Sequence, residues 1–289
     1  MESNIHSLMP RQRWSIPIEL MVYFGLSFAF TWAFHSAIII FKISFNADPR
    51  SASQLLYAIG IAGPLAGALL VTGISRGRAG VFDLLRTAFR WRFRWTWYAV
   101  ALFIIGAVYL LSLVLYCLFG GALPTPLIRL SFNGFLLAVL GQIYVVIGEE
   151  YGWRAFALPR LHCIFGSLGA SLILGAAWAC WHLPMFFVSG SNQYGTSFLL
   201  YLLDMVFWTI VLTLIYYRTG GSVLACMIFH ASLNLWFFIL NFPKKASGYA
   251  LGLTVLVGLF VLTRLPRPFF KKPVSPADAR VENRQGENL

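Results

Sequence analysis

The sequence predicts an all-α protein, a polytopic membrane helical bundle with about eight transmembrane helices. Of the 289 residues, 59% are hydrophobic and only 11% are charged, whereas soluble domains carry about 25% charged residues. The mean hydropathy of +0.74 agrees with this composition. The apolar stretches run for about twenty residues or more, the length that crosses a bilayer as a helix, and show no alternation of polar and apolar residues. The missing alternation excludes an outer-membrane barrel.

Eight apolar segments account for the expected transmembrane helices, and turn-forming residues separate them. The fourth segment is the longest, because it contains a pair of glutamates and continues through Arg154 to Leu161. The segments lie near residues 17–44, 54–75, 96–120, 130–162, 166–188, 197–217, 221–240 and 248–264.

The chain divides into a short N-terminal cytoplasmic segment (1–15), a transmembrane bundle (16–265) and a C-terminal tail (266–289). We expect the tail to be disordered, because it is polar and rich in Pro, Lys and Arg. The core of the bundle is expected at about 130–240. No internal repeat is detectable in the sequence, which weakens the hypothesis of an inverted-repeat transporter.

The positive charge is distributed unequally between the two sides of the predicted bundle. Only five of the 22 Lys and Arg residues fall on one side, which leaves 17 for the side that carries both termini; the five are Lys42, Arg50, Arg129, Lys244 and Lys245. Because cytoplasmic loops are rich in Lys and Arg, this bias predicts that both termini are cytoplasmic. Membrane topology therefore explains the net charge of +12, and no nucleic-acid partner is expected.

The stretch GVFDLLRTAFRWRFRW is amphipathic if it is helical. One face carries apolar side chains and another face carries arginines, with two tryptophans near the end. Such a helix is typical of a membrane interface with anionic lipid. The apolar residues are Phe82, Leu85, Phe89 and Phe93, the arginines are Arg86, Arg90 and Arg94, and the tryptophans are Trp91 and Trp95.

A few polar residues lie inside the apolar segments, where ionisable side chains are costly and usually functional. They are Glu149, Glu150, His182, His230 and Asn234. Glu149 comes about fourteen residues before the turn near 163–167 and His182 about sixteen residues after it, so an antiparallel helix pair brings them to the same depth. His230 and Asn234 are four residues apart and share a helix face. We therefore expect all of them to converge near the middle of the bundle.

These residue types suit hydrolysis in a buried site. A carboxylate in a low-dielectric pocket can serve as a general base near neutral pH, so Glu149 and His182 could activate water. His230 and the amide of Asn234 could then donate to an oxyanion. Glu150 and Arg154 have the spacing of a helical ion pair, which we expect to fix the helix and orient Glu149. Zinc held by Glu149, His182 and His230 is an alternative, although the chain contains no HExxH motif.

These positions resemble the motifs of the CPBP family, which comprises type II CAAX prenyl endopeptidases and bacteriocin-processing or self-immunity proteins. Glu149, Glu150 and Arg154 match the first family motif, two glutamates followed by an arginine. Trp178 and His182 match the second, an aromatic residue four before a histidine. His230 and Asn234 match the third, and a Gly-Gly-Ser turn precedes them. The similarity extends over most of residues 20–240.

The resemblance implies an intramembrane endopeptidase of eight helices that acts on a membrane-associated peptide, or on a prenylated one if its substrate is of the CAAX type. It implies that Glu149 and His182 activate water and that His230 and Asn234 form the oxyanion hole, with no cofactor required in the favoured mechanism. In a bacterium the protein would reside in the plasma membrane, in contact with membrane lipids. The alternatives are a non-catalytic scaffold or immunity protein of the same fold and a transporter. We single out only Asp204 besides the Glu pair as an intramembrane acid, which disfavours a transporter.

Overall fold

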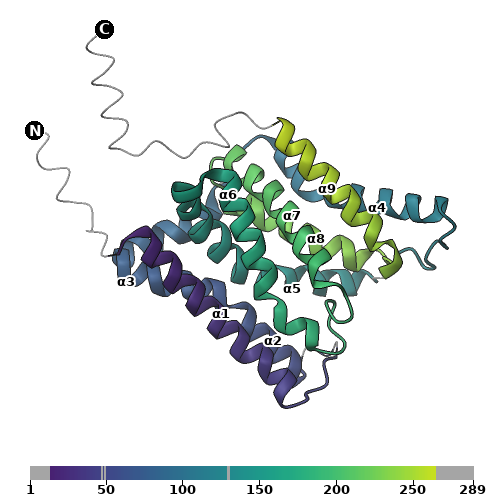
Figure 1. Ribbon diagram of the computed structural model, residues 1–289, viewed down its shortest axis with the longest axis horizontal. Helices are drawn as coiled ribbons and strands as arrows, with labels where there is room; N and C mark the ends of the chain where they lie inside the picture. The colour runs from purple at the N-terminus through teal and green to yellow at the C-terminus, as the bar shows by residue number, and fades with distance from the viewer. Residues whose placement is uncertain (1–13, 47, 49, 129–130, 265–289) are drawn as a thin grey trace, which may run out of the picture.

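The computed structural model describes residues 14–46, 48, 50–128 and 131–264. Within these ranges the protein is built from helices that run along one elongated bundle, with no strand (Figure 1). The predicted tail, 266–289, lies outside the described residues, as does nearly all of the predicted N-terminal segment, 1–15. The all-α prediction is confirmed.

The first half of the chain forms helices whose starts follow ordinary capping rules. Proline occupies the first turn of α1 (Ile16–Ile40) and of α3 (Gly63–Arg86), where its missing N–H costs nothing. The side chain of Ser51 accepts a hydrogen bond from the Gln54 amide and caps α2 (Ala52–Ile61). A short η1 turn (Thr87–Phe89) then leads to α4 (Trp95–Leu118).

The second half begins with α5 (Phe132–Glu150), which is capped by Ser131 and continues directly into a π-helical segment, η2 (Tyr151–Ala157). Ser222 caps α8 in the same way. The remaining elements are α6 (Leu158–Trp181), η3 (Leu183–Phe187), α7 (Phe198–Arg218), α8 (Val223–Ile239), η4 (Lys244–Ala246) and α9 (Ser247–Arg264).

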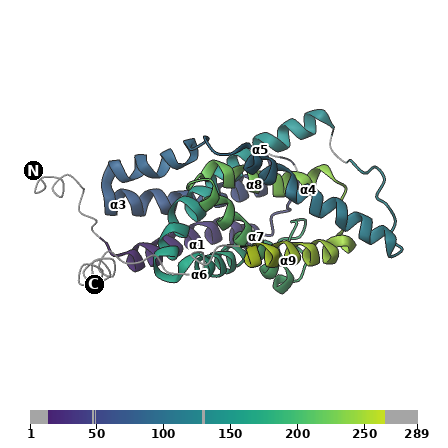
Figure 2. The same cartoon turned by 90° about the horizontal axis from the view of Figure 1, so that it is seen from above.

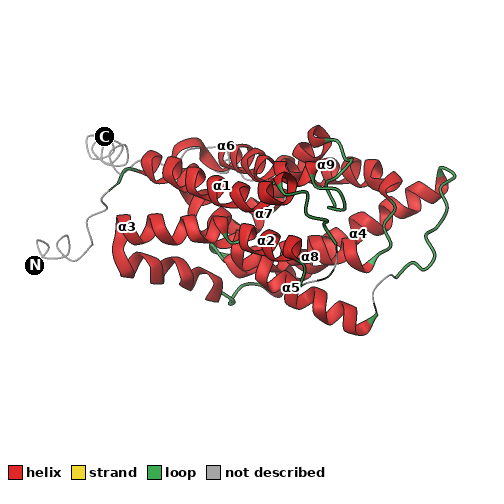
Figure 3. Ribbon diagram, turned by 90° about the horizontal axis from the view of Figure 1, so that it is seen from below, coloured by secondary structure: helices red, strands yellow, loops and turns green. Residues whose placement is uncertain are grey.

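Two glycines reverse the chain inside elements that are otherwise continuous helix. Gly77 (φ 66°) bends α3 into two arms, and Gly166 (φ 69°) divides α6 (Figures 2 and 3). Both sit in the left-handed region, which other residues rarely adopt. Six helical stretches are long and apolar enough to cross a membrane, the longest of them Phe132–Phe187, and α8 is a shorter apolar helix. Gly166 divides that longest stretch into two helices that could each cross the membrane. With α8 included, the described residues contain about eight potential transmembrane helices, as predicted.

Contacts between distant segments define the two ends of the bundle. At one end Arg90 donates from Nη1 to the Gly220 carbonyl (2.9 Å), and the Ser222 hydroxyl donates to the Arg90 carbonyl (2.6 Å). At the other end the Asn241 amide donates to the Leu127 carbonyl (2.9 Å). We call the first of these the basic end, because the segments predicted to be cytoplasmic meet there.

The buried face of α1 is polar along most of its length. The side chains recur every four residues, so they lie on one face, and each is at most 1% exposed: Glu19, Tyr23, Ser27, Thr31 and His35. Glu19 accepts from Arg160 Nε at 2.5 Å and lies 3.7 Å from Arg76. The sequence interpretation missed Glu19 among the intramembrane acids; its arginine partners make it part of an ion-pair cluster at the basic end.

Candidate active site

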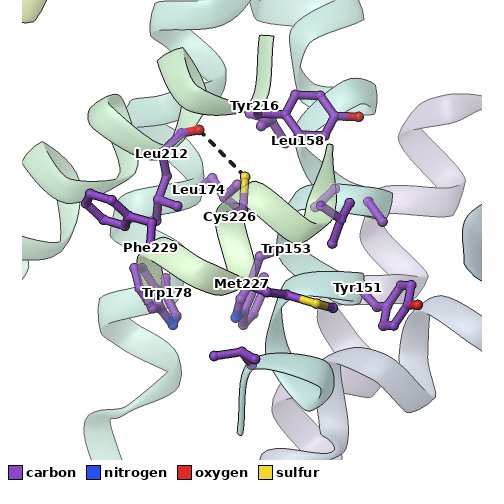
Figure 4. Close-up of a cluster of buried hydrophobic side chains, with 14 of the residues drawn as sticks. Tyr151, Trp153, Leu158, Leu174, Trp178, Leu212, Tyr216, Cys226, Met227 and Phe229 are labelled. Carbon is purple, nitrogen blue, oxygen red and sulfur yellow. Dashed lines mark hydrogen bonds between the residues drawn. The ribbon is translucent and has the colours of Figure 1, made fainter. Parts of the chain in front are cut away.

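Trp178 of α6 connects the predicted catalytic residues. Its indole N–H donates to Glu149 Oε2 at 2.7 Å, and both side chains are nearly inaccessible. The His230 ring lies 5.1 Å from the indole ring, and the His182 ring lies 6.2 Å from it. The indole itself sits in an aromatic and aliphatic core with Trp153 and Phe229 (Figure 4). One rigid side chain therefore contacts the carboxylate and lies near both imidazoles.

The reversal at Gly166 places Glu149 beside the helical turn that carries His182. Contacts of Glu149 with Trp178 and of Trp153 with Trp181 both connect α5 and η2 to the returning part of α6. These paired positions are centred close to residue 165, as expected for an antiparallel hairpin. Glu149 and the turn that carries His182 therefore lie at the same depth in the bundle, as the sequence predicted.

The hydrogen bond of His182 fixes its tautomer. His182 Nδ1 lies 2.9 Å from the carbonyl oxygen of Trp178. A carbonyl oxygen only accepts, so Nδ1 carries the proton and Nε2 keeps its lone pair. The ring also packs 4.7 Å from Trp181 and 5.6 Å from Tyr201. His182 thus presents a basic nitrogen held in one orientation.

Glu150 and Arg154 form a buried pair, as predicted, and Glu150 has a further contact, with His230, that the sequence did not indicate. Glu150 Oε1 accepts from Arg154 Nη1 at 2.7 Å and lies 2.8 Å from His230 Nδ1. The Arg154 guanidinium also lies 4.4 Å above the Trp178 ring. The Glu150 carboxylate thus reaches α8 and holds His230, and Arg154 packs on the indole that holds Glu149; the expectation that the pair orients Glu149 stays a prediction.

The local helix geometry directs two consecutive carboxylates to different neighbours. Neighbouring residues on an α-helix project about 100° apart, so Glu149 faces α6 while Glu150 faces α8. The π-helical turn η2 begins directly after them, and all seven of its residues are buried. Such turns occur frequently at functional sites. The α-helical periodicity of the sequence did not reveal this one.

Asn234 lies one turn beyond His230 and has a partner that the sequence interpretation missed. Its amide nitrogen donates to Gln142 Oε1 at 2.7 Å. The carboxamide nitrogen has two hydrogens, so one of them stays available. Gln142 is buried and precedes Glu149 by two helical turns, which places both on one face of α5. Gln142 could have been identified from the sequence, because it is a polar residue inside an apolar segment.

Two tyrosines lie near Glu149, and the sequence interpretation assigned neither of them to the site. Tyr201 of α7 packs on the ring of His182 at 5.6 Å, and Tyr57 of α2 packs near His35. Tyr57 stacks on His35 at 5.2 Å, and its carbonyl lies 3.2 Å from His35 Nε2. The surroundings of Glu149 therefore include α2 and α7 in addition to α6.

The zinc alternative, with Glu149, His182 and His230 as ligands, stays a prediction. Within the part of the chain that the structure describes, no group of three or more His, Cys, Asp or Glu side chains has the arrangement of a metal site. Glu149 Oε2 is taken by Trp178, and His230 Nδ1 by Glu150. We therefore derive no catalytic step through a metal.

Comparison with known proteins identifies the family. Residues 131–236 match the family model described as type II CAAX prenyl endopeptidase, Rce1-like. This stretch is similar to the domain of the CAAX prenyl endopeptidases. The matched range contains all five residues singled out for catalysis, together with Arg154. The resemblance to CPBP proteins inferred from the motifs is thereby confirmed.

A curated relative supports the same conclusion. CAAX prenyl protease 2 of Methanococcus maripaludis is 28% identical over 189 residues, which cover 60% of this chain and 67% of the relative. Together with the apolar helices, the family indicates a multi-pass integral membrane protein, and the relative indicates a protease. The individual residue roles remain hypotheses and are developed next.

Proposed function

We propose that this protein is an intramembrane endopeptidase that hydrolyses a peptide bond of a membrane-associated substrate, with a prenylated CAAX-type peptide as the leading candidate. The name of the curated relative supports this substrate class. The observation that carries the proposal is the gathering of Glu149, His182 and His230 around Trp178. Protease catalysis needs a base, an oriented water and an oxyanion donor, and this cluster contains groups for each.

In the proposed first step Glu149 takes a proton from water while the water oxygen attacks the scissile carbonyl. Trp178 holds Oε2, which leaves Oε1 to accept a hydrogen bond from the water. The lone pair of His182 Nε2 accepts the other water hydrogen, since Nδ1 is committed to the Trp178 carbonyl. Two acceptors with fixed positions orient the attacking lone pair.

The tetrahedral intermediate carries its negative charge on the former carbonyl oxygen. An imidazolium at His230 donates to it from Nε2, because Nδ1–H is bonded to Glu150. The remaining amide hydrogen of Asn234 supplies a second donor. Glu149 then returns its proton to the leaving amine, which completes the hydrolysis with the carboxylate restored.

The distribution of Lys and Arg supports an orientation with both termini in the cytoplasm. Among the described residues, the loop that carries Arg90, the turn before Ser222 and the Arg160 region meet at the basic end of the bundle, which supports this orientation. We propose the plasma membrane as the location in a bacterial host.

The test is cleavage of two peptide pools, one plain and one prenylated at a CAAX-type C-terminus, by the purified protein with product detection by mass spectrometry. Glu149→Gln keeps the shape of the side chain and removes the base, so we expect products to disappear while the melting temperature holds. Asp83→Asn makes the same chemical change at an exposed position and should cleave normally. A chelator should not change the rate.

Full activity in Glu149→Gln would refute the mechanism. If the unmodified protein yields no product from either pool, the result favours a non-catalytic scaffold or immunity protein of the same fold.

A further inference from the structure

An apolar groove lies between α4, α7 and α9, apart from the candidate active site. Its volume is about 360 Å³, within the range of small-molecule sites. Every lining residue is apolar, and none belongs to the cluster around Trp178. The lining includes Trp97 and Val100 of α4, Leu214 and Ile215 of α7, and Val257 and Val261 of α9.

The groove extends over the two to three turns of its three helices that lie nearest the basic end of the bundle. Trp97 is in the first turn of α4, and Ile215 is in the last turn of α7. Val261 is likewise one turn from the end of α9. In a membrane the end of the groove at Trp97 and Ile215 would therefore face the headgroups, and the rest would lie at the depth of the acyl chains.

Two arginines continue the groove beyond its apolar lining. Arg94 is the residue directly before α4, and Arg218 is the last residue of α7 and follows Leu214 by four, so both lie just beyond the apolar lining at the same end of the groove. Both side chains are exposed, and neither pairs with a carboxylate among the described residues. The open amides at the start of α4, which has no side-chain cap, add partial positive charge.

The segment that carries Arg94 is fixed beside the end of α7. Arg90 bonds to Gly220, Ser222 bonds back to Arg90, and the Tyr98 hydroxyl donates to the Trp91 carbonyl at 2.6 Å. The segment that carries Arg94 is thereby fixed against the end of α7 that carries Arg218.

We propose that this groove binds one acyl chain of an anionic phospholipid, whose phosphate lies between Arg94 and Arg218. A wholly apolar lining offers no hydrogen bond to a peptide but suits a hydrocarbon chain. The two unpaired cations select a negative headgroup over a zwitterionic one. The proposal is independent of the proteolytic function, since the groove shares no residue with the candidate active site.

The test is competition between phosphatidylglycerol and phosphatidylcholine with identical acyl chains, added to the delipidated full-length protein, with bound lipid counted by native mass spectrometry. An anionic surface attracts each nearby Lys or Arg by roughly fivefold, so the two arginines predict a preference on the order of twenty-fivefold for phosphatidylglycerol. High salt should reduce this preference.

In the double variant Arg94→Gln and Arg218→Gln, the retained amounts of the two lipids should become nearly equal. The retention of phosphatidylcholine should not change. Lys244→Gln combined with Lys245→Gln, exposed at the opposite end, is the matched control and should keep the preference. Val257→Trp fills the groove and should lower retention of both lipids at an unchanged melting temperature. Equal retention by the unmodified protein, or a preference that survives loss of both arginines, overturns the proposal.

Discussion

His230 Nδ1 lies 2.8 Å from Glu150 Oε1, although 80 residues separate them in the chain. The same carboxylate oxygen accepts from Arg154, so one buried acid connects α8 to the π-helical turn. Both side chains are almost completely buried, which makes the hydrogen bond strong and its loss expensive. Glu150 therefore acts on the reaction through the orientation and charge of His230.

Glu150→Gln should lower turnover by roughly 10- to 100-fold, the range expected when a hydrogen bond to a charged group is weakened. The amide keeps the shape of the side chain but no longer stabilises an imidazolium at position 230. The measurement is kcat on the best peptide from the pool, with KM recorded separately. We expect KM to change little, because Glu150 does not face the substrate in the proposed mechanism.

A structural effect is separated from this one by Arg154→Ala, which leaves Glu150 as an uncompensated buried charge. That variant should lose about 3–5 kcal/mol of stability and unfold at lower temperature. If Glu150→Gln melts equally early and its remaining folded fraction turns over normally, Glu150 has no role in orienting His230.

Asn234→Ala should reduce turnover by about 10²–10³-fold if its amide donates to the oxyanion. The change removes a half-buried carboxamide, so the fold should survive. Single-turnover rates on the same peptide provide the measurement. Gln142→Leu removes only the partner of the Asn234 amide and should give a smaller loss of rate. An unaltered rate in Asn234→Ala excludes this residue from the oxyanion hole.

Gly175→Ala should lower the melting temperature, because an added Cβ would lie 2.7 Å from the Val206 Cα across the contact between α6 and α7. Overpacking of this kind costs about 1–3 kcal/mol. Gly141→Ala is the matched control in α5, since a Cβ there meets nothing within 4 Å. Equal melting of the two variants would contradict the tight packing of these helices.

The orientation can be read from cysteine labelling of intact cells. Ala122→Cys, in the exposed loop after α4, should react with a membrane-impermeant maleimide from outside. The native Cys163 is exposed near the turn at Gly166 and should react only after the cells are opened. The reverse pattern would place both termini outside.

Helical spacing predicted the parts of the site that lie within one hairpin. The segment lengths on either side of Gly166 are enough to bring Glu149 level with His182. The contacts of Glu150 with His230 and of Gln142 with Asn234 depend on α5 packing beside α8. No local pattern specifies which helices become neighbours, so the sequence could not reveal the partner of Glu150.

Glu19 was missed for a related reason. Its neighbours in the sequence are apolar, and its partners, Arg76 and Arg160, come from α3 and α6. From the sequence alone, an isolated acidic residue near the start of an apolar segment is expected to lie at the membrane surface. The same limit applies to η2, since the seven residues of a π-helical turn carry no distinct hydrophobic period.

The polar face of α1 has a consequence for how the protein is made. Glu19 leaves the ribosome 141 residues before Arg160, which is its nearest partner in the finished bundle. An unpaired acid in a bilayer costs about 3 kcal/mol on insertion scales. We therefore expect the polar face of α1 to become fully buried only after α3 has supplied Arg76 and α6 has supplied Arg160, so the first helix to be made is among the last to be packed.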